Sequence, residues 1–259
     1  MRLPRFKLAP ALLVALAVGT VPLAGARAEG ETDFLAGRTK ACPNCSLPNA
    51  ALKRKDLTGV DLSGANLAGA VLHRARLPRA KLDGANLTGA NLNKTDLRNA
   101  SLAQARLAGA MLYEAEASAA DFTGADLTGG KMGRVRLTRA VLDGAKISEA
   151  VLTGARMDEA SLKGADLSAT NLIEVSLRRA NLEGADLNNS GLIDAVLRDA
   201  NLKGANLSEA DLFGADLSNA DLAGADLSES RLTRAILTGA NLEGAKLKGA
   251  LMPDGSVHE

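Results

Sequence analysis

The sequence contains very few aromatic residues: no tryptophan, one tyrosine and four phenylalanines among 259 residues. A globular core of ordinary width is usually filled by large aliphatic and aromatic side chains. Their near absence excludes such a core here. It favours a narrow interior of uniform width, filled by small and medium-sized side chains.

Histidine and cysteine are also scarce, with two of each. A structural zinc site needs about four ligands, and His73 and His258 are poorly placed to complete a set with the cysteines. We find no pairing of a nucleophile with a base, no acid–base pair and no phosphate-binding loop. The sequence therefore predicts a protein that is not an enzyme and that binds no metal or other cofactor.

The segment 1–28 differs in composition from the rest of the chain. Three basic residues among the first seven precede an apolar run at 8–23, and positions 26–28 read Ala-Arg-Ala. This order is typical of a secretory signal peptide. The run is short for a membrane span, so we expect cleavage and export to the periplasm or beyond, with no membrane span afterwards; a retained anchor is the alternative. The remaining chain has 27 Lys/Arg and 30 Asp/Glu, a net charge of −3.

From Leu47 to Met252 the sequence repeats in units of five without an insertion or deletion. We call each unit a pentad and its middle residue the centre. Of the 42 centres 36 are Leu, and Ala occupies 32 of the 42 positions two before a centre, so both positions are apolar. A helix rotates about 500° per pentad and would scatter the centres around its axis. A short extended piece followed by a tight turn fits the period, with centre and Ala both facing inward.

Proline and glycine indicate where the turns lie. Each of the four prolines after Ala28 stands directly after a centre, where a β-turn favours φ near about −65°. The following residue is Gly at nine of the ten positions spaced by 20 from Gly64 to Gly244. Such a column indicates a turn that needs positive φ and recurs once per coil. Four pentads therefore close one coil.

These patterns predict an all-β solenoid, a quadrilateral parallel β-helix of about ten coils. We expect residues 29–44 to form an N-terminal cap segment, 45–253 the β-helix and 254–259 a C-terminal tail. The first coil of a solenoid exposes its core and needs a cap. Phe34 and Leu35 are the residues expected to cover it.

Cys42-Pro43-Asn44-Cys45 lies directly before the first Leu centre. The period extends back to it and places both thiols inward, on either side of a Pro-Asn turn. Such a turn holds its outer Cα atoms within about 7 Å, inside the range for a disulfide, and an exported protein meets an oxidising compartment. Cys42 and Cys45 are therefore a disulfide candidate. Two buried free thiols, or a metal or redox role, are the alternatives.

Asp or Asn often stands directly before a centre. A column of carboxylates is compatible with acid chemistry or calcium binding. These side chains occupy a consensus position of the repeat, however, and Asp and Asn readily bond to nearby backbone. We interpret the column as structural.

The repeat A-[D/N]-L-x-G, as in Ala215-Asp216-Leu217-Ser218-Asn219 and Ala240-Asn241-Leu242-Glu243-Gly244, resembles the pentapeptide-repeat family over residues 45–253. The resemblance implies a right-handed quadrilateral β-helix, and a C-x-x-C just before the repeats resembles a subgroup. Most members have no established activity, but some mimic DNA and inhibit a topoisomerase. A DNA-mimicking gyrase inhibitor is thus the alternative function. The predicted export and the net charge of −3 argue against it.

With four pentads in a coil, one exterior face differs from the others. We call it the Leu52 face, since its centres are Leu52 and every twentieth residue to Met252. Its outward positions carry the apolar side chains of Met111, Tyr113, Val151, Ile173, Ile193 and Phe213. Exposed apolar patches mark partner sites, so we expect this face to bind a protein partner or a second copy. Support of sheet pairing by stacked apolar side chains is the alternative.

Charge is divided along the chain. Residues 29–140 carry 16 Lys/Arg and 11 Asp/Glu, whereas residues 141–259 carry 11 and 19. The division predicts a dipolar rod whose halves meet different or antiparallel partners, and a merely solvated surface is the alternative. Together the patterns favour an exported, non-enzymatic scaffold for protein–protein interaction in the cell envelope, with no nucleic-acid partner.

Overall fold

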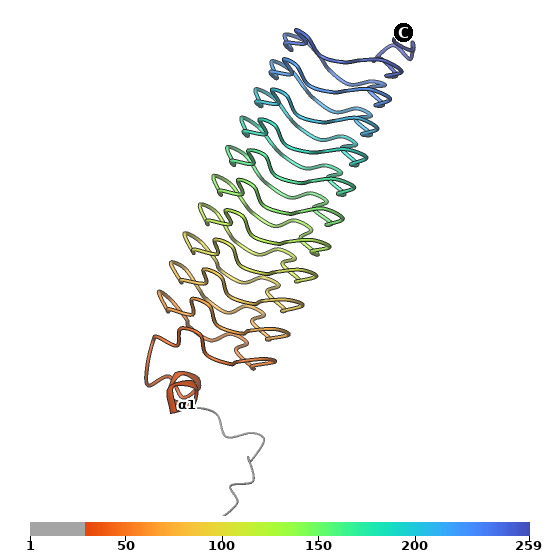
Figure 1. Ribbon diagram of the computed structural model, residues 1–259. Coiled ribbons are helices and arrows are strands. Elements are labelled where there is room, and N and C mark those ends of the chain that lie inside the picture. Colours follow the sequence, from red (N-terminus) through yellow and green to blue (C-terminus); the bar gives the residue numbers. More distant parts are fainter. Residues whose placement is uncertain (1–28) are drawn as a thin grey trace, which may run out of the picture.

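The computed structural model describes residues 29–259, so the predicted signal peptide at 1–28 lies outside the described residues. The chain winds into a long rod with α1 at one end and the C-terminus at the other (Figure 1). Helix α1, Glu29–Leu35, is the only helix among residues 29–259. Within this part of the chain, no helix has the length and apolar character needed to cross a membrane.

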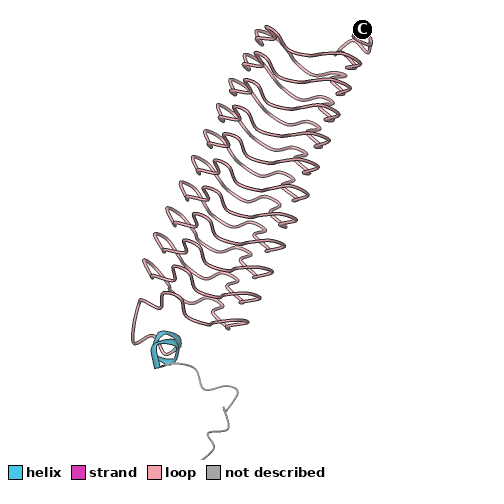
Figure 2. Cartoon of the chain, viewed as in Figure 1, coloured by secondary structure: helices cyan, strands magenta, loops and turns pink. Residues whose placement is uncertain are grey.

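Each coil pairs with the next through parallel bridges between positions that lie 20 apart, such as Ala51 with Val71 and Val71 with Asn91. This register continues from Ala41 to Leu251. The described part of the chain has no extended strand beyond these bridges, and Figure 2 shows loop outside α1, because a turn follows every short extended piece. The turns recur once per pentad. The coil therefore has the four sides that the glycine spacing predicted.

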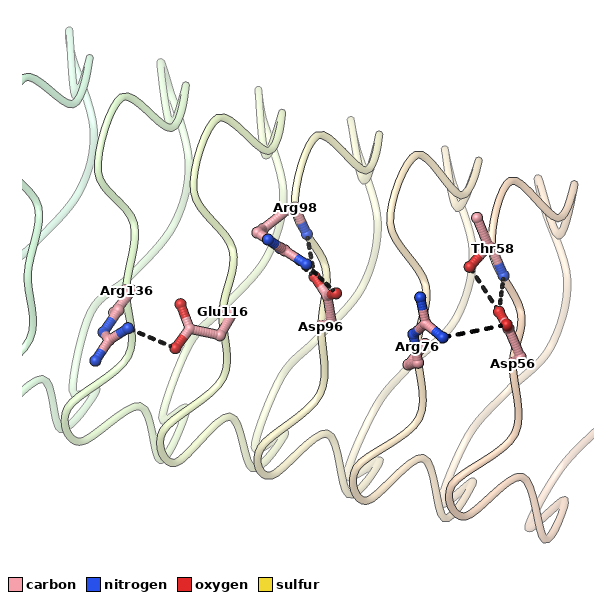
Figure 3. Close-up of polar contacts among 7 residues, drawn as sticks. All are labelled: Asp56, Thr58, Arg76, Asp96, Arg98, Glu116 and Arg136. Carbon is pink, nitrogen blue, oxygen red and sulfur yellow. Dashed lines mark hydrogen bonds and ion pairs between the residues drawn. The ribbon is translucent and has the colours of Figure 1, made fainter.

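The backbone hydrogen bonds explain the consensus of the pentad. The amide of the centre donates to the next coil, as Leu57 does to Arg76 at 2.7 Å, and two further amides of each pentad also donate between coils. A fourth amide closes the β-turn, as Val60 does to Leu57 at 3.2 Å. The fifth, that of Thr58, donates to Oδ1 of Asp56 at 3.1 Å (Figure 3). The Asp/Asn column thus satisfies the one amide that the coil leaves free, as its structural interpretation predicted.

The turns adopt positive φ at all four corners, not only at the glycine-rich one. Gly144 has φ of 62°, but Glu159 has 59° and Ala169 has 52°. Pairing between coils holds every corner in the same conformation, so a residue with a Cβ accepts left-handed geometry where the repeat has no glycine. Each such residue costs roughly 1 kcal/mol relative to the right-handed region.

The core consists of stacked centres and inner alanines. Leu62 and Ala65 have no exposed surface, and Phe122, the one aromatic centre, is 1% exposed. Burial of each Leu side chain stabilises the fold by about 2 kcal/mol before entropy is subtracted. Thr95 replaces an inner alanine, and its hydroxyl donates to the carbonyl of Leu72 at 2.9 Å. The buried hydroxyl therefore has a hydrogen-bond partner in the backbone.

The two ends of the core are covered differently. Phe34 of α1 is 4% exposed and Leu35 packs against the core, so these side chains cover the first coil as expected. The predicted tail at 254–259 folds back on the last coil, where Val257 pairs antiparallel with Leu251. The sequence contained no signal for this pairing. The tail covers the last coil incompletely, so Leu242 and other centres of this coil are only partly buried.

Candidate functional site

The described residues contain no group of three or more His, Cys, Asp or Glu side chains that could hold a metal ion. Cys42 and Cys45 lie at disulfide-bonding distance, with Cα atoms 5.4 Å apart. Cys42 is buried, and its Sγ lies 3.5 Å from the carbonyl oxygen of Gly30. The pair thus spans a single turn of the first coil and contacts the α1 segment through Cys42, which is a structural position.

The residues predicted as an interaction surface all lie on the outside of the Leu52 face, but their exposure differs. Tyr113 and Val151 are 40% and 43% exposed. The other four are half-buried: Met111, Ile173, Ile193 and Phe213. Of these six residues, Tyr113 and Val151 therefore offer the most apolar surface to a partner. A role of these six residues in binding remains a prediction.

Phe213, the last of the six residues along the chain, lies under two arginines. The guanidinium of Arg231 lies 4.4 Å from the ring centroid, and that of Arg234 lies 5.4 Å from it. Arg231 also forms an ion pair of 3.1 Å with Asp211. The ring is thus part of a cation–π cluster. This arrangement, which the sequence alone did not indicate, leaves less of Phe213 for an apolar partner.

A hollow of about 500 Å³ lies beside Tyr113. Its lining comes from Tyr113, Lys131, Gly133, Arg134, Val151 and Thr153. The hollow forms because Gly133 has no side chain between Tyr113 and Thr153 in its column. We call it the Gly133 hollow. Sequence reasoning located Tyr113 and Val151 but missed Gly133, whose signal is the loss of a side chain from an outward column.

A second hollow, of about 510 Å³, lies along the neighbouring corner. Its lining comes from Glu114, Glu116, Arg134, Arg136, Gly154, Arg156 and Glu174. Here Gly154 interrupts a column that otherwise carries Arg134 on one side and Glu174 on the other. We call it the Gly154 groove.

Ion pairs within the groove occupy some of its charges. Arg136 lies 2.9 Å from Glu116, and this ion pair is drawn in Figure 3. Lys94 lies 3.1 Å from Glu114. The hydroxyl of Tyr113, followed by Lys94, lowers the pKa of Glu114. Glu114 is therefore ionised and paired at neutral pH.

Basic side chains gather on the N-terminal part of the Leu52 face. Partial desolvation lowers the pKa of His73, and repulsion from Arg74 and Lys53 lowers it further. His73 is therefore neutral at pH 7 and adds no charge to this cluster. Arg54, Arg74, Lys94 and Arg134 occupy the same corner position of the Leu52 face, with Glu114 between the last two and bonded to Lys94.

The coil geometry shows on which faces the Lys and Arg side chains of the N-terminal half lie. The next side of the coil has Leu57 and every twentieth residue after it as its centres, and we call it the Leu57 face. Within residues 51–140, outward positions of the Leu52 and Leu57 faces carry 11 Lys/Arg and 4 Asp/Glu. Within the same residues, outward positions of the other two faces carry 2 Lys/Arg and 4 Asp/Glu. The positive charge is thus confined to two adjacent faces, which also hold both hollows.

The model for the family of pentapeptide repeats matches this chain with 8 copies. The matched residues are 56–93, 90–129, 136–172, 176–214, 190–228 and 215–252. No curated protein matches the chain.

Several solved structures are similar. HetL, a pentapeptide repeat protein involved in heterocyst differentiation regulation from the cyanobacterium Nostoc, is 36% identical, with 88% of this chain and 97% of that chain covered and a TM-score of 0.45. A pentapeptide repeat protein from the Arabidopsis thaliana thylakoid lumen is 33% identical over 37% of this chain and 67% of its own, with a TM-score of 0.35. QnrB1, a plasmid-mediated fluoroquinolone resistance protein, is 21% identical over 70% and 88%, with a TM-score of 0.33.

The repeat match extends over most of the segment 56–252 and so over more than half of the chain. It agrees with the parallel coils of four pentads. The fold is a right-handed parallel β-helix, and the chain belongs to the pentapeptide-repeat family.

Proposed function

We propose that this chain is an exported, non-enzymatic scaffold that binds a partner protein of the cell envelope through its Leu52 face. The observation that carries the proposal is that two exposed apolar side chains, Tyr113 and Val151, line one hollow next to a second one, on a rod whose outward positions are mainly polar. A rigid surface of this kind binds without having to order itself first.

Charge supports the choice of partner. The Leu52 and Leu57 faces carry most of the Lys and Arg side chains of residues 51–140, so an acidic partner surface is favoured there. The same charge disfavours the alternative of a DNA-mimicking gyrase inhibitor, because mimicry needs a continuous negative surface. A gyrase supercoiling assay tests that alternative, and inhibition by the purified rod would replace our proposal.

Site-specific photocrosslinking in the native compartment tests the scaffold proposal. Benzoylphenylalanine is placed at Tyr113, and a matched control is placed at Thr123, an exposed position two pentads on and therefore on the opposite side of the coil. We expect a defined adduct from position 113 and none from position 123. No adduct from either position, or equal adducts from both, would contradict the proposal.

Export is tested separately by the mature N-terminus. We expect mass spectrometry of the native protein to find a chain that starts near Glu29. A protein that retains Met1 in the cytoplasm would contradict export and revive the alternative.

A further inference from the structure

The Gly133 hollow and the Gly154 groove adjoin each other and share Arg134. The coil that carries Gly133 and the coil that carries Gly154 are paired by a parallel β-bridge between Lys131 and Val151. We propose that together they form one binding site for a segment of a partner protein in which an acidic side chain stands next to an apolar one. This inference deepens the proposed scaffold function and rests on it.

Two arginines without an ion-pair partner among the described residues form the half of the site that would bind the acidic side chain. Arg136 is bound to Glu116 at 2.9 Å. Within residues 29–259, by contrast, no carboxylate lies within ion-pairing distance of Arg134 or Arg156, although both line the groove. Guanidinium groups bind carboxylates through paired, charge-assisted hydrogen bonds. The gap at Gly154 leaves room for such a carboxylate between the two arginines.

The apolar half of the site lies one coil away. The ring of Tyr113 leans over Gly133, since a Cβ built on Gly133 would lie 3.4 Å from Cδ2 of Tyr113. Val151 and Thr153 form the other side of the hollow. A Leu or aromatic side chain of a partner would bury surface against Tyr113 and Val151. Aromatic anchors in such hollows dominate the affinity of protein interfaces.

The acids around the arginines restrict the size of the anion. Glu114 and Glu116 lie on the coil before Arg134, and Glu174 lies on the coil after Gly154. A polyanion that followed the rod axis would meet negative charge at both ends of the groove. A single carboxylate avoids this repulsion. The arrangement therefore favours an acidic peptide segment over a nucleic acid.

A small probe tests the site without knowledge of the partner. We use 3-phenylpropionate, which joins an aromatic ring to a carboxylate, and its uncharged analogue 3-phenylpropanamide. Backbone amide signals of Gly133 and Gly154 in the full chain report binding by NMR. We expect both signals to shift with the carboxylate, and the amide analogue to bind at least tenfold more weakly.

Gly154→Glu provides the matched variant. Arg134 and Glu174 hold side chains at φ of 55° and 57° in the same column, so the fold accepts a side chain there. The new carboxylate would pair with Arg134 and Arg156 and weaken probe binding at least tenfold. Gly144→Glu is the control, because Gly144 has the same left-handed backbone, lies at another corner and has open space around it. It should bind the probe like the wild type.

Equal binding of the two probes, or unchanged binding by Gly154→Glu, would overturn the inference. So would tighter binding of a DNA dodecamer that shifts the same glycine signals. If the probe does not bind but Tyr113 crosslinks a partner, the site is wrong and the scaffold proposal stands. If the probe binds and no partner crosslinks, the site stands and the scaffold proposal fails.

Discussion

The amide of Gly144 donates a hydrogen bond of 2.8 Å to the carbonyl oxygen of Lys163. Gly144 and Gly164 therefore occupy the same corner on consecutive coils, as the spacing of the glycine column predicted. No atom lies within 4 Å of a Cβ built on Gly144. The corner thus selects glycine for its backbone conformation and not for lack of space.

The first prediction concerns this conformation. Gly144→Ala should lower the free energy of unfolding by about 1 kcal/mol, because alanine is strained at positive φ. Ala169→Gly should raise it by a similar or smaller amount, since Ala169 already has φ of 52°. Urea unfolding of the two variants measures the difference. Changes of the same sign would show that the corners do not strain their non-glycine residues.

Asp226 should contribute to acid sensitivity. It accepts a hydrogen bond of 3.0 Å from the amide of Ser228, and its carboxylate lies 3.0 Å from Nζ of Lys246. The hydrogen bonds from Ser228, followed by that from Lys246, lower the pKa of Asp226 from 3.8 to about 2. Since the folded pKa is below the unfolded one, the ionised group stabilises the fold above pH 3.8, and this contribution is lost as the pH falls through 2.

Asp226→Ala should therefore lower the thermal midpoint at pH 6, by the equivalent of about 1 kcal/mol. Its difference from the wild type should shrink as the pH falls from 4 to 2. Asp226→Asn keeps an oxygen acceptor for Ser228 and loses only the charge, so it should be affected less. A difference that stays constant over this pH range would exclude a role for ionisation.

Core substitutions should depend on their place along the rod. Leu142 has no exposed surface, whereas Leu242 lies in the incompletely covered last coil. Leu142→Ala should cost about 2–5 kcal/mol through lost burial and a cavity. Leu242→Ala should cost clearly less, because water already reaches this position. Equal losses in urea unfolding would indicate that another molecule covers the last coil.

The cysteine pair should stabilise the N-terminal cap only. Alkylation of the protein, isolated from its natural source and then denatured, should label no cysteine before reduction and two after it. Replacement of both cysteines by serine should cost about 2 kcal/mol, as a short disulfide loop does, and should speed hydrogen exchange in α1. Exchange beyond Leu162 should not change, because each coil contacts only its neighbours. Labelling of two cysteines without a reductant would show free thiols instead.

Much of the fold was predictable because the interactions that define it repeat. The pentad period of Leu and Ala determined which side chains face inward, and the fourfold longer period of glycine determined the number of sides. The Asp/Asn column was interpreted as structural, and Asp56 shows the reason: it binds the amide of Thr58. Such local and periodic contacts depend on sequence spacing alone.

The candidate site was only partly predictable. The sequence by itself placed Tyr113 and Val151 on one face, because their positions in the coil follow from counting. Only the tertiary structure decided that Gly133 and Gly154 open adjoining hollows and that Arg231 covers Phe213. It also decided that, among residues 29–259, Arg136 has an ion-pair partner and Arg156 has none. Spacing determines where a side chain starts, but rotamers and contacts between neighbouring coils determine where its charged or aromatic end lies.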